Sequence, residues 1–342
     1  MRIFMLEVKK IIRTRVTWIL LLAALLLSGL MAYIPVTFEG VSVQNGDGER
    51  TEFSGLAAVH YLQDLRADIS GDVTAENVQR AVREYQSALK EYGATDSYEL
   101  PEEVYYDRLI KYQPFVHGVR EVFSDEKTGM APGFLSLSLE EVGTFYEKAP
   151  VRLANLMRME GSSQSDIDKA QVMYQKVEKP FQYYTGVEGN SMDYQVLYIF
   201  LLTIFCAVIV SPIFSMEYQT GSDDILRCTK YGRLRLAVTK ILSALCITGI
   251  TFLLCGIIWI LVTNTLFGWE STKTSMQMIF SASSLPAINM GELEWVNLLG
   301  SFLLFLSHLL PDLRCCLPCL QSEAKRTENK TERLTKISDY LL

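Results

Sequence analysis

Residues 16–36 read VTWILLLAALLLSGLMAYIPV, a run that contains no charged side chain. A helix rises about 1.5 Å per residue, so about 20 residues cross the roughly 30 Å hydrocarbon core of a bilayer. The run therefore predicts a transmembrane helix. A cleaved signal peptide is the alternative, but its apolar region would be shorter, and no small-x-small cleavage site follows this run.

Two further runs of the same kind follow later in the chain. Residues 196–214 read VLYIFLLTIFCAVIVSPIF, and residues 241–262 read ILSALCITGITFLLCGIIWILV. Each is long enough to span a bilayer. A fourth run, residues 295–310, is shorter and predicts a short, marginal transmembrane helix. The predicted fold class is an all-α integral membrane protein with a helical transmembrane bundle.

The distribution of Lys and Arg predicts the orientation of these helices, because loops rich in Lys and Arg stay in the cytoplasm. Residues 1–15 and residues 215–240 each contain five Lys or Arg, whereas residues 263–294 contain only Lys273. We therefore expect a multi-pass protein of the cell membrane with a cytoplasmic N-terminus. The expected sides are cytoplasmic for residues 1–15, 215–240 and the polar tail 311–342, and extracellular for residues 37–195 and 263–294.

The N-terminal segment has apolar and basic side chains on opposite faces of a helix. The apolar face contains Phe4, Val8, Ile11 and Ile12, and the basic face contains Lys9, Lys10 and Arg13. This pattern predicts that residues 3–14 form an amphipathic helix lying in the cytoplasmic surface of the membrane. A merely charged flank of the first span is the alternative.

Residues 37–195 form a large insertion between the first two spans. The insertion is acidic and contains none of the seven cysteines, so disulfides cannot stabilise it. Apolar residues recur every three or four positions from Val78 to Tyr92, Thr74 can cap this helix, and Gly93 can end it. Further expected elements are helices from Pro101 to Tyr112, from Ser138 to about Lys148 and from Ser165 to near Pro180, and a short strand within Thr37–Val43. The insertion is therefore predicted to be a mainly α-helical extracellular domain.

No recognisable catalytic or metal-binding motif occurs in the sequence. His60 and His117 stand alone, and no HExxH pair, Gly-x-Ser-x-Gly elbow or calcium loop is found. Carboxylates such as Glu84 alternate with Arg and Lys and are interpreted as solvated helix faces. Cys316 and Cys319 have redox-motif spacing, but an incidental cysteine cluster is favoured over a redox or metal site. We therefore expect no enzyme activity, no cofactor and no metal.

The segment between the second and third spans carries a recognisable pattern. An acidic residue follows the second span, a Gly lies four residues later, and an Ile-Leu pair, a Gly-Arg turn and a Lys at the start of the third span follow. These residues are Glu217, Gly221, Ile225, Leu226, Gly232, Arg233 and Lys240. With the amphipathic N-terminal helix and the large insertion, the chain resembles the type-two permeases of bacterial ATP-binding cassette (ABC) exporters with an enlarged external domain. The resemblance covers residues 1–40 and 190–265.

The resemblance implies a permease subunit that moves an unidentified substrate by alternating access. Residues 215–240, including the seven residues above, would dock on a separate ABC ATPase subunit, and the permease would work as a homodimer or with a second permease. The sequence lacks the Gly-x-x-x-x-Gly-Lys-Ser/Thr phosphate cradle, so any ATP hydrolysis must come from a partner. No soluble part has the basic, aromatic face that a nucleic acid would require, so the expected partners are these proteins and the lipid bilayer.

Two other functions remain open at this point. The first is a membrane-anchored sensor or accessory protein whose extracellular helical domain binds a ligand or peptide. The second is an intramembrane enzyme, which would need ionisable residues within the spans, and the first three spans contain no charged residue.

The chain departs from the family pattern near its C-terminal end. Members usually have six spans, whereas here the sequence changes from apolar to charged at residues 307–314. We hypothesise a truncated or frame-shifted version of a longer permease. The absence of an apolar continuation in the neighbouring reading frames would argue against this hypothesis.

Overall fold

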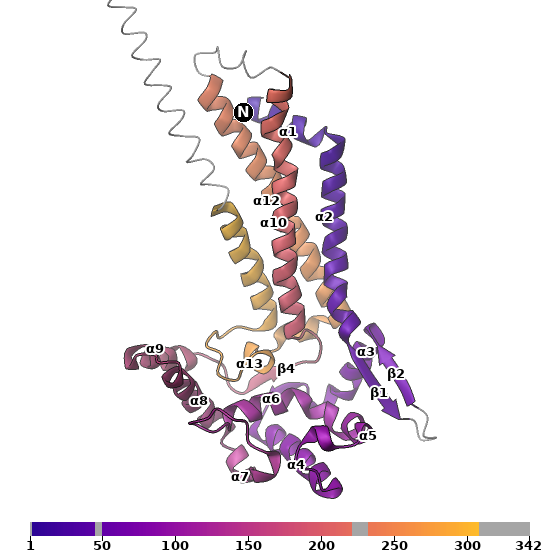
Figure 1. The fold of residues 1–342 in the computed structure, drawn as a ribbon, viewed down its shortest axis with the longest axis vertical. Helices are drawn as coiled ribbons and strands as arrows, with labels where there is room; N and C mark the ends of the chain where they lie inside the picture. The colour runs from indigo at the N-terminus through magenta and orange to yellow at the C-terminus, as the bar shows by residue number, and fades with distance from the viewer. Residues whose placement is uncertain (1, 45–49, 221–231, 308–342) are drawn as a thin grey trace, which may run out of the picture. The chain divides into compact units, whose positions relative to one another are not determined.

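The computed structural model describes residues 2–44, 50–220 and 232–307 (Figure 1). Within them, three helices are long and apolar enough to cross a membrane. They cover Arg15–Phe38, Gly189–Val210 and Val238–Phe267, and each overlaps one of the three long apolar runs. Most of the described chain is helical. The prediction of a mainly α-helical protein is therefore confirmed, and the three helices are compatible with the predicted membrane spans.

The chain divides into two compact units. Unit 1 comprises Met1–Gly29, Val196–Trp259 and Asn297–Leu342, and unit 2 comprises Leu30–Gln195 and Ile260–Val296.

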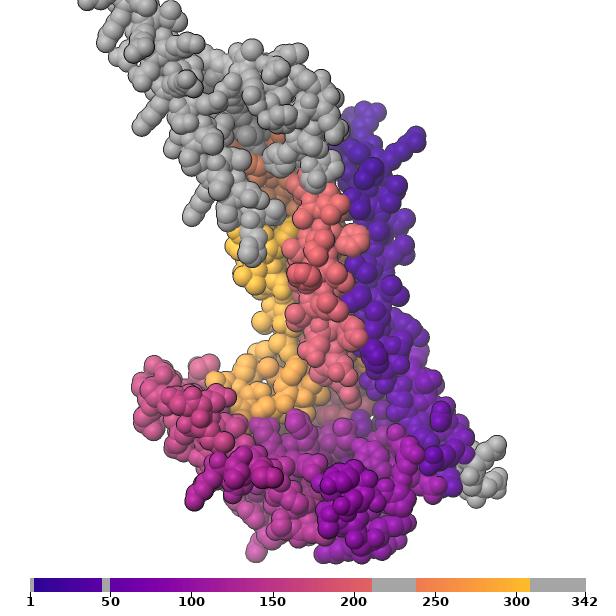
Figure 2. All heavy atoms as spheres, viewed as in Figure 1, coloured from indigo at the N-terminus to yellow at the C-terminus, as the bar shows by residue number. Residues whose placement is uncertain are grey.

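Unit 1 is a bundle of apolar helices. Its members are α1 (Arg2–Ile12) and the parts within this unit of α2 (Arg15–Tyr33), α10 (Gly189–Thr220), α12 (Gly232–Phe267) and the helix over residues 290–307. The last helix begins before the fourth apolar run of the sequence, and it is not among the three candidate spans. Figure 2 shows the side chains of α2, in indigo, lying against those of α10.

The amphipathic N-terminal helix is present as α1, and its buried face packs on two of the spanning helices. Ile11 is 5% exposed and clusters with Ile209 of α10 and with Ala244 and Ile247 of α12. Val8 packs against the same cluster, whereas Ile12, which we had placed on the apolar face, is exposed. The helix therefore contacts both of the helices that flank residues 221–231.

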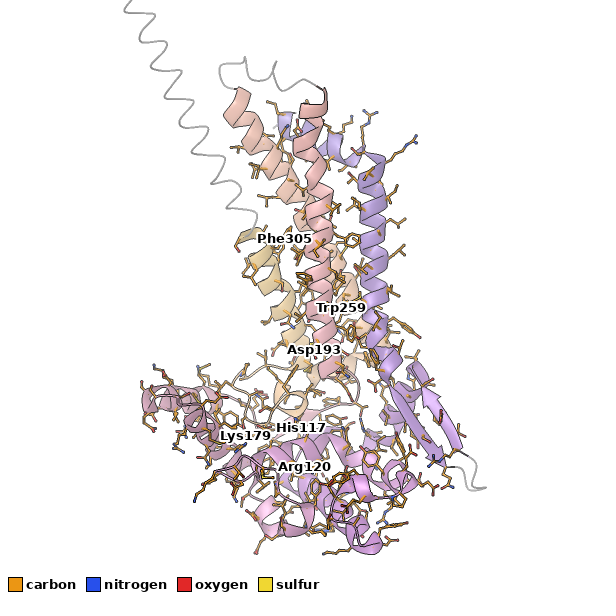
Figure 3. The ribbon with its side chains drawn as sticks, viewed as in Figure 1. His117, Arg120, Lys179, Asp193, Trp259 and Phe305 are labelled. Atoms are coloured by element: carbon orange, nitrogen blue, oxygen red, sulfur yellow. The ribbon has the colours of Figure 1, made fainter. Side chains whose placement is uncertain are left out.

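Close packing of aromatic and small side chains fills the rest of the bundle. Phe252 of α12 stacks on Phe305 of the helix over residues 290–307, with 5.2 Å between ring centroids. Trp259 is fully buried, and Phe305 is 4% exposed (Figure 3). Gly256 leaves no room for a Cβ atom, because Leu298 occupies that space. These contacts hold the helix over residues 290–307 against α12.

Unit 2 is built around α4 (Ala75–Tyr92). Its buried face contains Val78, Val82 and Leu89, and its neighbours are α6 (Gln113–Val122), α7 (Leu139–Val142) and α8 (Phe145–Met159). Thr74 Oγ1 accepts a hydrogen bond from Asn77 N, and Gly93 ends the helix at a φ of 64°. Both predicted helix boundaries are therefore confirmed.

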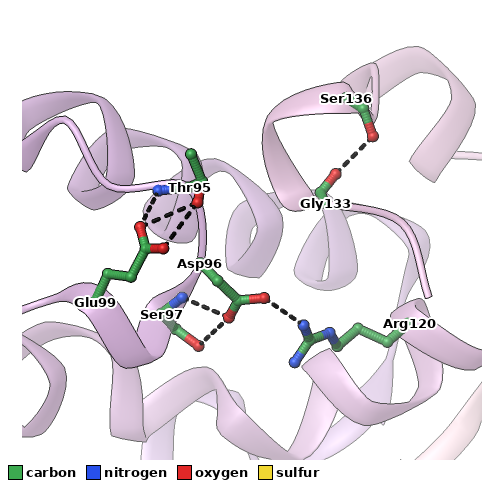
Figure 4. Close-up of polar contacts among 7 residues, drawn as sticks. All are labelled: Thr95, Asp96, Ser97, Glu99, Arg120, Gly133 and Ser136. Atoms are coloured by element: carbon green, nitrogen blue, oxygen red, sulfur yellow. Dashed lines mark hydrogen bonds and ion pairs between the residues drawn. The ribbon is translucent and has the colours of Figure 1, made fainter. Parts of the chain in front are cut away.

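Short elements and polar links complete unit 2. The remaining elements up to α10 are η1 (Ile34–Phe38), α3 (Leu56–Leu65), η2 (Ala67–Ile69), η3 (Ser97–Glu99), α5 (Glu102–Val104), η4 (Tyr105–Leu109), η5 (Ile110–Tyr112), η6 (Phe134–Ser136) and α9 (Gln164–Tyr174). Asp96 accepts from Ser97 N at the start of η3 and also from Arg120 of α6, at 2.7 Å (Figure 4). This carboxylate fixes the segment after α4 to α6.

Two antiparallel strand pairs occur in the described part of unit 2. Strand β1 (Gly40–Gln44) pairs with β2 (Arg50–Ser54), with Val41 opposite Phe53. Strand β3 (Gly71–Val73) pairs with β4 (Phe181–Tyr183), with Gly71 opposite Tyr183. The second pair joins two segments that are distant in sequence, and it has no counterpart in the sequence-based prediction.

Residues 260–296 belong to the same unit as the insertion, although residues 196–259 separate them in sequence. This second segment contains η7 (Trp269–Lys273) and α13 (Met276–Ile279). Ser275 N donates to Gln182 O, and Tyr184 N donates to Thr274 Oγ1, both at 2.9 Å. If α10 and α12 each cross a membrane, the two segments must lie on the same side of it, as the charge pattern predicts.

Three predicted elements of the insertion need correction. Instead of one helix from Pro101 to Tyr112, the structure has the short pieces α5, η4 and η5. Ser138 caps a helix as expected, accepting from Glu141 N, but α7 ends at Val142 and a separate helix follows. The cap of α9 is Ser163 and not Ser165, because its hydroxyl accepts the hydrogen bond from Asp166 N.

Candidate functional site

A cavity of about 140 Å³ opens within unit 2. Three segments line it: the first half of α6, the chain from β4 into α10, and α13. The lining residues are Gln113, Pro114, His117, Tyr183, Tyr184, Gly186, Val187, Glu188, Gly189, Met278 and Ile279. The cavity combines amide, imidazole, phenol and carboxyl groups with apolar side chains, which is the composition typical of small-ligand sites.

Local structure explains how these side chains come together. The β3–β4 pairing fixes Tyr183, and Thr274 Oγ1 both accepts from Tyr184 N and donates to Tyr184 O. Helix α6 begins at Gln113 with Pro in its first turn, and His117 follows one turn later. His117 Nε2 lies 3.3 Å from Phe280 O, directly after α13 (Figure 3).

Gly186 is required where the chain leaves β4 for α10. Its φ is 154°, and a Cβ atom there would lie 2.5 Å from both Phe267 O and Ser271 Cβ. Any other residue would force residues 267–271 away from this wall of the cavity, since 2.5 Å is far inside van der Waals contact.

Behind this wall lies the buried guanidinium of Arg66. The residue is 2% exposed, and it donates to Tyr183 Oη at 3.2 Å, to Ile110 O at 2.9 Å and to Gln113 Oε1 at 3.4 Å. Its Nε has no partner, and within the described residues no carboxylate oxygen lies within ion-pair distance of the guanidinium. A buried positive charge that contacts only neutral groups is costly, and it favours negative charge nearby.

The carboxyl groups of Glu39 and Glu188 are the acidic groups near Arg66, although neither forms an ion pair with it. Burial, with a smaller contribution from Glu188, raises the pKa of Glu39 to about 7, although Arg66 acts in the opposite direction. Burial also raises the pKa of Glu188, again opposed by Arg66. Neither carboxyl accepts a hydrogen bond from another described residue, so both are available to a ligand or a proton.

The arrangement favours binding over covalent chemistry. A ligand carrying a positive group could pair with Glu188 and restore its ionised form, while His117, Gln113 and Tyr184 offer hydrogen bonds. Among the described residues, no three His, Cys, Asp or Glu side chains come together at a spacing that would hold a metal ion.

The residues that the sequence analysis assigned to the ATPase-coupling segment do not line this cavity. Glu217 is in the last turn of α10, and Gly232 and Arg233 are the first residues of α12 rather than a turn. Lys240 is buried within α12 at 5% exposure. Gly221, Ile225 and Leu226 lie outside the described residues, as do Cys316 and Cys319. Both helices therefore extend into the predicted loop.

Sequence reasoning missed the group formed by Glu39, Arg66 and Glu188. Its members are far apart in the chain, and each is an ordinary charged residue in an acidic segment. The available signals were weak: Arg66 follows the apolar helix α3, and Glu188 stands in a Gly-rich stretch before the second span. Neither signal specifies burial or proximity.

Comparison with known proteins gave no relative. The chain matches no family model, no curated protein sequence and no solved structure.

Proposed function

We propose that the chain is the membrane-spanning permease subunit of an ATP-driven ABC exporter, which works with a separate ATPase subunit and a second permease. The proposal builds on the resemblance of residues 215–240 to the coupling segment of such permeases. The structural observation that best supports it is the position of α1. Because Ile11 packs on both α10 and α12, the basic N-terminus lies at the same end of the bundle as the helix ends flanking residues 221–231.

That end of the bundle has the properties of a cytoplasmic docking site. Residues 1–15 and 215–240 hold most of the positive charge near the spans, and this distribution favours the cytoplasmic side. Helices α10 and α12 continue to Thr220 and back to Gly232, so movement of the intervening segment would reach both spans directly. An ATPase that binds the segment containing Glu217, Gly221, Ile225, Leu226, Gly232 and Arg233 could therefore tilt the two spans together. Lys240 is buried in α12 and would follow this movement without contacting the ATPase.

Co-purification with an ATPase tests the proposal. The tagged full-length chain, solubilised from its native membrane, should retain a protein that hydrolyses ATP. The charge reversal Arg233→Glu should reduce that retention about tenfold or more, since about 1.4 kcal/mol of interface energy corresponds to a factor of ten. Arg158→Glu, on the exposed end of α8, is the matched control and should leave retention unchanged. Equal retention by both variants would contradict docking at this segment.

The cavity beside Glu188 favours a second candidate function, a membrane-anchored accessory protein whose outer domain binds a ligand. We propose small molecules with a protonated amine as the class to test, because the carboxyl of Glu188 lines the cavity and has no hydrogen-bond donor among the described residues. Thermal stabilisation of the purified chain by a panel of amino acids and small primary amines is the measurement.

Two variants decide between binding at this cavity and binding elsewhere. Glu188→Gln should abolish the stabilisation, whereas Glu178→Gln, an exposed carboxyl in the same unit, should preserve it. Stabilisation that survives Glu188→Gln would exclude this site. Retention of an ATPase by a wild-type chain that no amine stabilises would favour the transporter over the accessory protein.

A further inference from the structure

A second buried carboxyl group, separate from the cavity, lies where three helical segments of unit 2 meet. Glu294, in the helix over residues 290–307, is 1% exposed. Its Oε2 accepts a hydrogen bond from Asn264 Nδ2 of α12 at 2.7 Å. Its backbone carbonyl accepts one from Gln195 Nε2 of α10 at 3.0 Å. One acidic side chain therefore sits at the centre of this junction.

The polar atoms around this carboxyl are incompletely paired. Glu294 Oε1 and Asn264 Oδ1 have no hydrogen-bond partner among the described residues, and the same holds for Thr263 Oγ1. Thr263 and Asn264 are, like Glu294, at most 1% exposed. An ionised carboxylate in this position would place a full charge against a single neutral donor, an arrangement that costs several kcal/mol.

No neighbouring charge compensates for that cost. The acidic residues on the surrounding elements are Asp193 on α10 and Glu292 on the same helix, and both are exposed. Helix α12 carries no charged side chain from residue 241 to its end. Lys273, the basic residue of η7, lies 2.6 Å from Glu270 and forms an ion pair with it. In the described structure, the buried carboxyl therefore faces amides and hydroxyls, without a cation.

We propose that Glu294 is a proton-binding site, which holds a proton on Oε1 while the helix over residues 290–307 packs on α12 and releases it when the carboxyl reaches water. A carboxylic acid and a primary amide can pair at two points, N–H to C=O and O–H to C=O. The first point is the observed bond from Asn264 Nδ2. A proton on Oε1 would supply the second, toward Asn264 Oδ1, and would account for both oxygens that lack a partner.

The titration of this group agrees with the geometry. Burial raises the pKa of Glu294 to about 7, although the hydrogen bond from Asn264 acts in the opposite direction. Proton release therefore falls in the physiological range, where a modest change of pH or of packing alters the charge. The proton site involves neither the ATPase nor the cavity at Glu188. Its test can therefore fail or succeed independently of the proposed function.

Infrared spectroscopy tests the proposal directly. The full-length protein in lipid nanodiscs should show a protonated-carboxyl C=O band that disappears between about pH 5.5 and pH 8.5, around the pKa of about 7. The buried carboxyls of Glu39 and Glu188 also contribute to this band, so the test is the difference between variants. Glu294→Gln should reduce the band by one carboxyl, and Glu294→Asp should restore that part with a shifted midpoint. Glu178→Gln is the control and should leave the band unchanged. A band of equal size in the wild type and in Glu294→Gln, or the absence of any component titrating above pH 6, would overturn the proposal.

Thermal unfolding gives a second readout. A carboxyl whose folded pKa is raised contributes stability below its unfolded value and loses it as pH rises through about 7. The Tm of the wild type should therefore fall between pH 5.5 and pH 8.5 relative to Glu294→Gln, whose amide stays neutral. Replacing sodium by choline should change neither curve. A sodium-dependent rise in Tm that Glu294→Gln abolishes would identify a metal ion in place of the proton and overturn the proposal.

Discussion

Buried polar groups find their partners differently in the two units. In unit 1, the hydroxyls of Thr248 and Thr251 donate to carbonyl oxygens four residues earlier in their own helix. In unit 2, the Glu121 carboxylate accepts from Ser281 Oγ at 2.6 Å and from Ala282 N at 2.8 Å, far away in sequence. One buried bond of the bundle does join two helices, the pair of Ser28 Oγ and Tyr198 Oη at 2.6 Å. The described polar bonds of the bundle are thus mostly local, whereas in unit 2 polar links between distant segments add to its hydrophobic core.

This difference agrees with the surroundings that the sequence predicts, which are lipid around the helices of unit 1 and water around unit 2. Inside a bilayer each helix must satisfy its own polar groups, so packing between small and large side chains determines which helices associate. In water, a carboxylate that accepts several N–H and O–H groups can fix a loop that has little apolar surface of its own. The following variants test whether the two units respond as this comparison predicts.

The largest effect is expected at Glu121. Glu121→Ala removes the acceptor of Ala282 N and of Ser281 Oγ, and one of the two acceptors of Ser283 N, which also donates to Ser281 Oγ. Hydrogen bonds to a charged group contribute about 1.5–3 kcal/mol each, and the buried Ala282 N–H is left unpaired, so unfolding should become easier by about 3 kcal/mol. Chemical denaturation followed by near-UV circular dichroism measures the change. The exposed Glu126→Ala is the control, and an equal loss from both variants would refute the link.

A smaller effect is expected at Gly256 in the bundle, where the variant adds an atom instead of removing hydrogen bonds. Gly256→Ala places a Cβ atom in the space of the Leu298 side chain, so the helix over residues 290–307 must move or repack. Overpacking of this kind costs about 1–3 kcal/mol. Gly300→Ala is the matched control, because no atom lies within 4 Å of its added Cβ. In thermal unfolding in detergent, Gly256→Ala should have the lower Tm. Equal Tm values for the two variants would contradict the close packing of Leu298 against Gly256.

The smallest effect is expected at Thr248. Thr248→Val keeps the shape of the side chain and removes only the hydroxyl, whose bond goes to Ala244 O of the same helix. The expected loss of stability is about 0.5 kcal/mol or less, since the backbone carbonyl keeps its helical partner. The same detergent unfolding assay applies. A loss similar to that of Glu121→Ala would show that the bundle also depends on hydroxyl bonds.

Much of the helical framework could be predicted from local signals in the sequence. The three candidate spans follow from apolar runs of about 20 residues, and the boundaries of α4 follow from Thr74 and Gly93. Local signals misplaced the start of α9, because Ser163 and Ser165 are both chemically competent caps. They also failed from Pro101 to Tyr112, where the chain forms short turns against β1 and α4 instead of one helix.

The candidate sites were beyond prediction for a physical reason. Arg66 donates to Tyr183, which lines the same cavity as Glu188, and Tyr183 is positioned by a strand pairing that has no local signature. Glu294 precedes a weak apolar run, and only the packing of Asn264 and Gln195 around it reveals a buried carboxyl. Burial of a charged residue is decided by its neighbours in space, and the chain gives no local indication of them.

Accessibility of two engineered cysteines in intact cells tests the central claim, that the coupling segment and unit 2 face opposite sides of the membrane. In a cysteine-free background, Ser222→Cys lies within residues 215–240, and Tyr98→Cys replaces a side chain that is 81% exposed in unit 2. A membrane-impermeant maleimide should label Tyr98→Cys in intact cells and Ser222→Cys only after permeabilisation. Labelling of Ser222→Cys from outside intact cells would contradict the account.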